Sequence, residues 1–104
     1  MPNMKFDDIE IELENVNISG NQEEIIIEFD GDFNLKDTVK NEFVVLIFRK
    51  YLAGEPINIK VNGVEIEAYV SIDFREDKSN NKLIFEGEAF HRLNKSKEPS
   101  IMYQ

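Results

Sequence analysis

The chain contains no cysteine, no tryptophan and only one histidine. Without cysteine it can form neither a disulfide framework nor a catalytic thiolate. A Ser-His-Asp arrangement would have to use His91, yet no serine stands in the context of a nucleophile elbow. The five glycines occur singly, so there is no glycine-rich phosphate-binding loop. These absences predict a protein that is not an enzyme and that uses no cofactor.

Long hydrophobic runs are also missing. The longest, from Phe43 to Phe48, has six residues, whereas a membrane-spanning helix needs about 20. Residues 1–10 lack the apolar stretch of a signal peptide. We therefore expect a cytoplasmic protein without a membrane partner. With 104 residues and 41% hydrophobic content, the chain suits one domain with one core.

Basic residues are absent between Phe6 and Leu35, a stretch that contains ten acidic residues. From Lys36 onward the chain holds eleven acidic and eleven basic residues, so the net charge of −9 belongs to the N-terminal third. A surface of one sign favours a partner of the opposite sign. Direct binding of nucleic acid is disfavoured, because phosphate contacts need clustered lysine and arginine.

The acidic third has the alternation of a β-hairpin. Residues 9–14 alternate between apolar and acidic side chains, which predicts a strand with one exposed face. The apolar phase then changes from odd to even positions, and a bulge near Asn15 would keep one face buried. After a predicted turn at 19–22, the alternation resumes over 25–33. The exposed face of this hairpin would carry Glu10, Glu12, Glu14, Glu28, Asp30 and Asp32.

Residues 35–52 can be interpreted in two ways. The composition of 43–48 is typical of a strand. Asn34, however, is a suitable helix N-cap, and Gly54 followed by Pro56 is a stop signal. Because both ends are marked as helix ends, we predict a helix over about 35–52. Its buried stripe would consist of Leu35, Val39, Phe43, Leu46 and Ile47.

The C-terminal half predicts a three-stranded antiparallel meander. Asn62-Gly63 is a strong signal for a two-residue hairpin turn. That turn brings the apolar residues of 57–61 and 64–68 to one face, so the turn and the hydrophobic pattern agree.

A polar loop over 75–82 would lead to the third strand of the meander. The register that satisfies every inward position pairs Phe74 with Leu83 and Ile66 with His91. His91 would then be a partly buried histidine with a structural role.

Together these segments predict an α+β fold. It consists of an N-terminal β-hairpin, one α-helix and the three-stranded antiparallel meander, with the helix packed on one face of the sheet. The domain would span 1–94, and 95–104 would be a mobile C-terminal tail. The helical segment Glu42–Lys50 (EFVVLIFRK) and the strand Ile57–Val61 (INIKV) resemble the core of the YkvR-like family of small uncharacterised Bacillus proteins. This resemblance implies a helix on an antiparallel sheet and brings with it no activity and no functional residues.

Asp30, Asp32 and Asn34 have the alternating oxygen ligands of a calcium loop. The match fails at the sixth position, which is Leu35 instead of glycine, and at the twelfth, which is Asn41 instead of glutamate. A strand that ends in a helix cap explains the same residues, so we predict no metal site and keep a calcium-binding module only as a third alternative.

The acidic hairpin face is the main functional candidate. Solubility and protection of an edge strand are the simplest explanation for it. However, like charges that face each other across a hairpin destabilise it, and no lysine is interleaved. The functional alternative is a face that binds a basic protein, with nucleic-acid-processing proteins as one class, or that mimics the charge of nucleic acid. Inhibitors of this type are expected among phages and mobile elements.

A structural or assembly module is the alternative function. An exposed strand edge, or the apolar end of the C-terminal tail at Ile101–Tyr103, would pair with further copies or with a larger complex. Homo-oligomerisation is therefore left open by the sequence.

Overall fold

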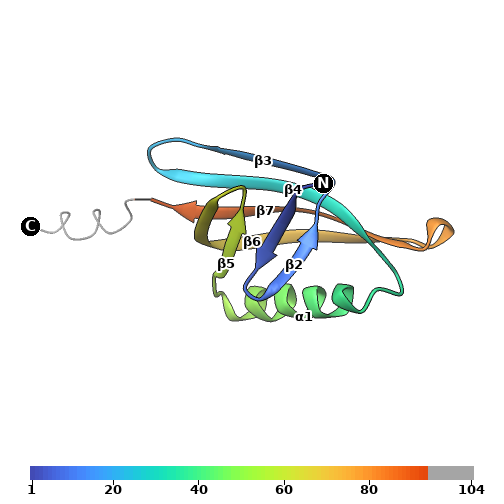
Figure 1. The fold of residues 1–104 in the computed structure, drawn as a ribbon. Helices are drawn as coiled ribbons and strands as arrows, with labels where there is room; N and C mark the ends of the chain where they lie inside the picture. Colours follow the sequence, from blue (N-terminus) through green and yellow to red (C-terminus); the bar gives the residue numbers. More distant parts are fainter. Residues whose placement is uncertain (94–104) are drawn as a thin grey trace, which may run out of the picture.

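The computed structural model describes residues 1–93, which form one α-helix and a seven-stranded antiparallel sheet (Figure 1). The α+β class and the single helix agree with the sequence prediction, whereas the expected hairpin and three-stranded meander understate the sheet. The predicted tail, 95–104, lies outside the described residues. The elements are β1 (Asn3–Phe6), β2 (Ile9–Glu12), β3 (Asn15–Gly20), β4 (Glu24–Asn34), α1 (Thr38–Ala53), β5 (Ile57–Val61), β6 (Val64–Asp77), the 3-10 turn η1 (Lys78–Asn80) and β7 (Lys82–Arg92).

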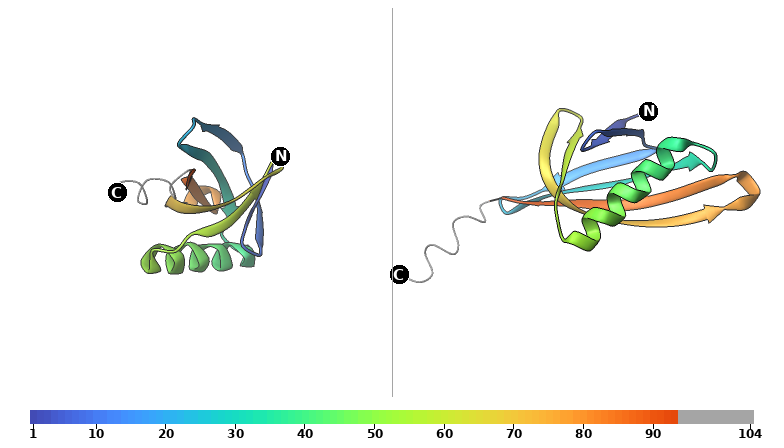
Figure 2. Two further views of the ribbon diagram at one scale, coloured as in Figure 1. Left: turned by 90° about the vertical axis from the view of Figure 1, so that its left-hand side faces the viewer. Right: turned by 90° about the horizontal axis from the view of Figure 1, so that it is seen from below.

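The strand order is β2-β1-β5-β6-β7-β4-β3, with every neighbouring pair antiparallel. The C-terminal meander β5-β6-β7 is therefore inserted between two N-terminal hairpins, β1-β2 and β4-β3. The sheet is strongly curved, and α1 lies across one side of it (Figure 2).

The expected N-terminal hairpin is confirmed for β3 and β4, which pair antiparallel. Its first part, β2, does not belong to it, because β2 and β3 lie at opposite ends of the strand order although they are consecutive in the chain. The change of apolar phase marks a corner between them. Leu13 N–H donates to the Pro2 carbonyl at 2.8 Å, and Glu14 N–H donates to the Asp30 carbonyl at 2.9 Å. The corner thus joins the two edges of the sheet. The partner of β2 is β1, which was missed because its four residues are too short to show a period.

Helix α1 spans Thr38–Ala53 and begins three residues later than predicted. Its N-cap is Asp37, whose Oδ1 accepts a hydrogen bond from Val39 N–H at 2.9 Å. Asn34 instead caps the preceding turn, where its Oδ1 accepts from Lys36 N–H at 2.9 Å. The stop signal acted as predicted, since Gly54 adopts the left-handed conformation with φ of 67°.

A cluster of phenylalanines joins the helix to the sheet. The Phe43 ring packs against Phe6, Phe33 and Phe85, with centroid separations of 4.9, 5.6 and 5.7 Å. Phe6 and Phe85 are fully buried, as is Phe43 itself. Of the predicted helix stripe, three side chains are buried and two are partly buried: Phe43, Leu46 and Ile47, then Leu35 and Val39. This inner layer fixes α1 on one face of the sheet.

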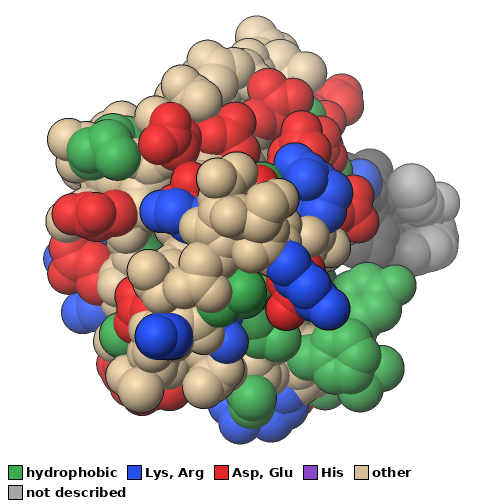
Figure 3. Space-filling model, turned by 90° about the vertical axis from the view of Figure 1, so that its right-hand side faces the viewer, with side chains coloured by type: hydrophobic (Ala, Val, Ile, Leu, Met, Phe, Trp, Pro, Cys, Tyr) green, Lys and Arg blue, Asp and Glu red, His purple; other side chains and the backbone are tan. Residues whose placement is uncertain are grey.

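Several large hydrophobic side chains remain outside the core. Four of them are on α1: Val45, Phe48, Tyr51 and Leu52. Two more, Tyr69 and Phe90, point away from the core on β6 and β7 and line one hollow with Tyr51 of α1. Hydrophobic side chains gather at one lower corner of the molecule, at the level of α1 (Figure 3).

The β5-β6 register was predicted correctly, with Val61 opposite Val64 across the Asn62-Gly63 turn. The β6-β7 register was wrong by two residues, since Phe74 faces Phe85 instead of Leu83. Both strands extend further than expected, up to Asp77 and from Lys82. A two-residue shift leaves each side chain on its predicted face, which explains why the hydrophobic pattern could not reveal it.

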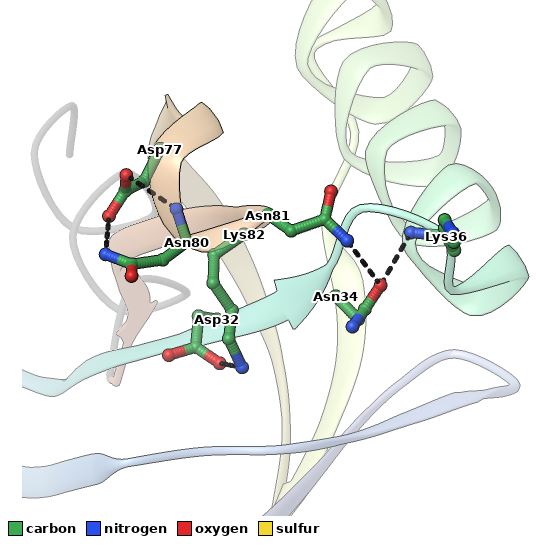
Figure 4. Close-up of polar contacts among 7 residues, drawn as sticks. All are labelled: Asp32, Asn34, Lys36, Asp77, Asn80, Asn81 and Lys82. Atoms are coloured by element: carbon green, nitrogen blue, oxygen red, sulfur yellow. Dashed lines mark hydrogen bonds and ion pairs between the residues drawn. The ribbon is translucent and has the colours of Figure 1, made fainter.

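Asp77 organises the short turn that sets this register (Figure 4). Its Oδ2 accepts from Asn80 Nδ2 at 2.9 Å, and its Oδ1 accepts more weakly from Asn80 N–H at 3.4 Å. Asn81 then takes the left-handed conformation with φ of 60°. A turn built from asparagine and aspartate side chains therefore replaces the long polar loop that was expected.

We expect Gly87→Ala to lower the free energy of unfolding by about 1–3 kcal/mol. A Cβ at this buried position would lie 2.8 Å from the Phe29 ring and 2.9 Å from the Ser71 carbonyl oxygen. Urea denaturation measures the effect. Glu86→Ala, whose side chain faces solvent on the same strand, is the control and should not destabilise the fold. Equal stability of wild type and Gly87→Ala would contradict the packing described here.

The side-chain hydrogen bond from Asn80, with contributions from Ser79 and Arg75, holds the pKa of Asp77 below its ordinary value of 3.8. A carboxyl whose pKa is lower in the folded state stabilises that state at higher pH, and the contribution is lost as pH falls through the folded pKa. Asp77→Ala should therefore lower Tm at neutral pH and much less well below pH 3.8.

Thermal unfolding at the two pH values tests this prediction. Glu76→Ala is the control, because its exposed carboxylate lies 4.0 Å from Lys78 and should have little effect at either pH. An equal loss of Tm at both pH values for Asp77→Ala would rule out a role of its ionised form.

Candidate functional site: an acidic groove

Five carboxylates from three adjacent strands meet on the sheet face opposite α1. Across β4, β7 and β6, the register aligns Glu28 with Glu88 and Ser71 in one row. The neighbouring row on the same face, two residues along each strand, aligns Asp30 with Glu86 and Asp73. Together these side chains line a hollow of about 790 Å³. We call this hollow the acidic groove and define it by Glu28, Asp30, Asp73, Glu86 and Glu88.

Strand alternation places these carboxylates outside and the core inside. In β4, the buried Ile27 and Phe29 alternate with Glu28 and Asp30, which point outward. In β7, buried residues 85, 87 and 89 alternate with outward acidic side chains in the same way. The same period therefore builds both the core and the groove.

Amide side chains on β3 orient two of the carboxylates. Asn15 Nδ2 donates to Asp30 Oδ1 at 3.0 Å, and Asn17 Nδ2 donates to Glu28 Oε1 at 3.5 Å. The residues that line the groove include no lysine or arginine. Within 1–93, none of the ion pairs found involves a groove carboxylate. The groove is therefore a concentration of uncompensated negative charge.

Different chemistry borders the groove at each end. At one end the outward row contains Tyr69 and Phe90, which are 56% and 36% exposed. At the other end Asp32 lies beside Lys82, with 3.4 Å between Oδ1 and Nζ. An aromatic surface and an ion pair thus flank the two acidic rows.

Like charges are aligned directly across the β4-β7 pair. Glu28 faces Glu88, and Asp30 faces Glu86. Directly opposed like charges destabilise a sheet by a few tenths of a kcal/mol to about 1 kcal/mol. The fold tolerates this arrangement because the other face of β4 buries Ile27 and Phe29 and that of β7 buries Phe85.

The structure divides the acidic residues that the sequence assigned to one face. Glu28 and Asp30 lie in the acidic groove, whereas Asp32 is paired with Lys82 at its border. The other three belong to the distant β2 strand or to the corner that follows it: Glu10, Glu12 and Glu14. Glu10 accepts a hydrogen bond from Asn3 at 3.1 Å.

Sequence reasoning missed Asp73, Glu86 and Glu88. These residues lie in the part of the chain where acids and bases are equal in number, so the net charge gave no signal there. Their alternation with apolar neighbours was visible, but which strand lies beside β4 was not. Only the observed pairing of β4 with β7 brings the two acidic sets together.

The three residues of the calcium alternative do not converge. Asp30 accepts from Asn15, and Asp32 pairs with Lys82. The Asn34 side-chain oxygen accepts from Lys36 N–H at 2.9 Å and from Asn81 Nδ2 at 3.5 Å (Figure 4). Across residues 1–93, no group of three or more acidic, histidine or cysteine side chains could hold a metal ion.

His91 lies near the end of β7, outside the acidic groove. Its partner on β4 is Ile25. The predicted pairing with Ile66 on β6 is wrong, because the β6-β7 ladder ends at Tyr69 and Phe90 in a register shifted by two residues. Its Nδ1 lies 2.7 Å from the Glu67 carbonyl oxygen, which can only accept, so Nδ1 carries the hydrogen. This ring nitrogen is thereby engaged with the backbone.

Comparison with protein-family models, curated proteins and solved structures found no match to this chain. The resemblance to the YkvR-like family stays a prediction. Among residues 1–93, no helix combines the length and the apolar character needed to cross a membrane.

We expect Glu88→Gln to raise the free energy of unfolding by about 0.2–1 kcal/mol, because it removes the repulsion with Glu28. The gain should be largest at low salt. Glu65→Gln is the matched control, since Glu65 directly faces Lys60 and its neutralisation should be neutral or destabilising. Urea denaturation at two salt concentrations measures both. A loss of stability in Glu88→Gln would mean that the groove carboxylates help to hold the sheet together.

Proposed function

We propose that this protein is a small, acidic, non-enzymatic binding protein that inhibits or regulates a basic partner through the acidic groove. The observation that carries the proposal is the convergence of five carboxylates from three strands on one hollow with no basic residue in its lining. A one-signed surface of this kind speeds the encounter with an oppositely charged surface and selects for it.

The dimensions of the groove favour a compact cluster of basic side chains. Neighbouring strands are about 4.8 Å apart and alternate residues on one strand about 6.6 Å apart. Two rows across three strands therefore form a short grid of charge and not an extended line. A few lysine or arginine side chains on a protein surface would fit such a grid.

The aromatic border adds a preference for arginine. Tyr69 and Phe90 are exposed in the row next to Glu88. A guanidinium group can pair with a carboxylate and also stack on an aromatic ring, whereas an ammonium group is a strongly hydrated point charge. Arginine side chains of the partner would thus contact both parts of this surface.

Nucleic-acid-processing proteins are the partner class that best matches this chemistry. Their basic side chains are positioned to contact phosphates. A carboxylate grid offers the same sign of charge and would occupy such a surface in place of nucleic acid. An inhibitor of the kind expected from phages and mobile elements would work in this way.

The opposed acidic pairs support a role beyond solubility. Solubility can be reached with acidic and basic side chains interspersed, which also stabilises cross-strand pairs. Alignment of Glu28 with Glu88 and Asp30 with Glu86 instead opposes folding. Functional sites are where a fold commonly departs from its most stable arrangement.

A second candidate function is an assembly module that acts through β3. This strand is last in the sheet order, so within the described chain only one of its edges is paired. Its residues, NVNISG, include neither lysine nor proline, which commonly block pairing between edges. A further strand could be added here, and such binding would persist at high salt.

A pair of charge-matched variants tests the proposed function. Glu86→Gln/Glu88→Gln neutralises the groove, and Glu10→Gln/Glu12→Gln removes the same charge from β2. Each immobilised variant is incubated with lysate of the source cell and washed at low and then high salt. We expect wild type and the β2 variant to retain a basic protein that elutes at high salt. The groove variant should bind that protein about tenfold more weakly, since charge pairs at close range are lost.

Equal loss in both variants would show that net charge alone drives binding and would contradict the assignment to the groove. A partner retained by every variant at high salt would instead favour the β3 edge. The free energy of unfolding of each variant should be measured alongside, so that altered binding is not confused with altered stability.

A further inference from the structure

The outer surface of α1 carries an apolar stripe that no described element covers. Val45, Phe48 and Leu52 are 57%, 62% and 72% exposed. They are spaced three and four residues apart, so they lie on one line along the helix, opposite the buried Phe43 and Ile47. From below, α1 stands in front of the sheet (Figure 2).

Two opposite charges flank this stripe on one side of the helix. Glu42 and Arg49 are seven residues apart, which places them on the same flank about 10.5 Å apart along the axis. They are too far apart to pair with each other, and neither contacts an opposite charge within residues 1–93. Lys50, in contrast, is paired with Glu55 at 3.5 Å.

We infer that α1 is the interface of a homodimer in which the two helices pack antiparallel through this stripe. A two-fold axis near the middle of the helix reverses the direction of the second copy and keeps the same flank on the same side. With this axis between residues 45 and 46, Val45 packs beside Val45 of the second copy, and Phe48 lies between Val45 and Asn41 of that copy. The same axis places Glu42 opposite Arg49 of the second copy, twice per dimer.

The self-complementary charge pattern identifies a second copy as the occupant. Stripe and charges are matched by one symmetry operation, whereas an unrelated partner would need its own matching pattern. The segment 36–50 contains four basic and two acidic residues, so this face does not share the negative charge of the whole chain. The acidic groove lies on the opposite face of the sheet and stays open in the dimer. This inference is therefore independent of the proposed function.

Charge exchange between two variants tests the antiparallel arrangement. Glu42→Arg and Arg49→Glu each place like charges opposite each other, so each variant alone should dissociate about tenfold more readily than wild type. An equimolar mixture should restore the dimer. One chain is then basic at both exchanged positions and the other acidic at both, so every pair across the interface again joins opposite charges. Light scattering over micromolar to millimolar concentrations measures the mass, which should approach twice the 12.1 kDa of the chain for wild type.

Phe48→Lys is the second variant. Its side chain is exposed in the monomer, so the fold and Tm should be retained while the dimer is lost. High salt should leave the wild-type dimer largely intact, in contrast to binding at the acidic groove. A monomer at all concentrations would overturn the inference, as would dimers unaffected by Phe48→Lys or by charge exchange. Binding of a monomeric chain to vesicles of anionic lipid, or dimerisation only after deletion of 94–104, would assign the stripe to a different occupant and also overturn it.

Discussion

The pairing of β4 with β7 is the contact on which the rest of the structure depends. It runs from Glu24–Arg92 to Asn34–Lys82 and joins the β3-β4 hairpin to the C-terminal meander. Because the side-chain period of a strand is two, a slip of one residue would move Ile27 and Phe29 to solvent and their acidic neighbours into the core. The register is therefore specified by the large free energy of burying these apolar side chains. The acidic groove inherits its geometry from that register.

Burial and charge act in opposite directions along the same strands. The inward side of β4 and β7 contributes Phe29 and Phe85 to a continuous phenylalanine cluster that reaches Phe43 on the helix. The outward side holds like charges in direct opposition. Burial of one aromatic side chain stabilises the fold by about 1.5–3 kcal/mol. Repulsion within one opposed acidic pair destabilises it by at most about 1 kcal/mol. The buried core thus compensates for the repulsion between acidic side chains on the outer face of the same strands.

The elements with local signals were predictable from sequence, and those that depend on distant pairing were not. Gly54 marked the end of the helix, and Asn62-Gly63 fixed the β5-β6 register, because turn chemistry acts within a few residues. The predicted β6-β7 register was wrong by two residues. A shift of two residues keeps every side chain on the same face, so the hydrophobic pattern does not distinguish the two registers. The insertion of the meander between β1 and β4 depends on pairing between strands far apart in the chain, which periodicity cannot report. For the same reason the sequence placed Glu28 and Asp30 on an exposed face but could not supply Glu86, Glu88 and Asp73.

Helix α1 divides the strands into an N-terminal half, β1–β4, and a C-terminal half, β5–β7. Within the chain the two halves are connected only by α1, and they pair with each other at two places in the sheet. The β1-β5 and β4-β7 seams are long-range, whereas every other strand pair is a local hairpin. Each half can form its hairpins early, and the two seams then close together when the meander enters the gap. The acidic rows straddle one seam, with two carboxylates from the first half and three from the second. The groove is consequently a property of the assembled chain alone, and polypeptides cut in the Gly54–Pro56 connection would each carry an incomplete set that docking of the fragments completes.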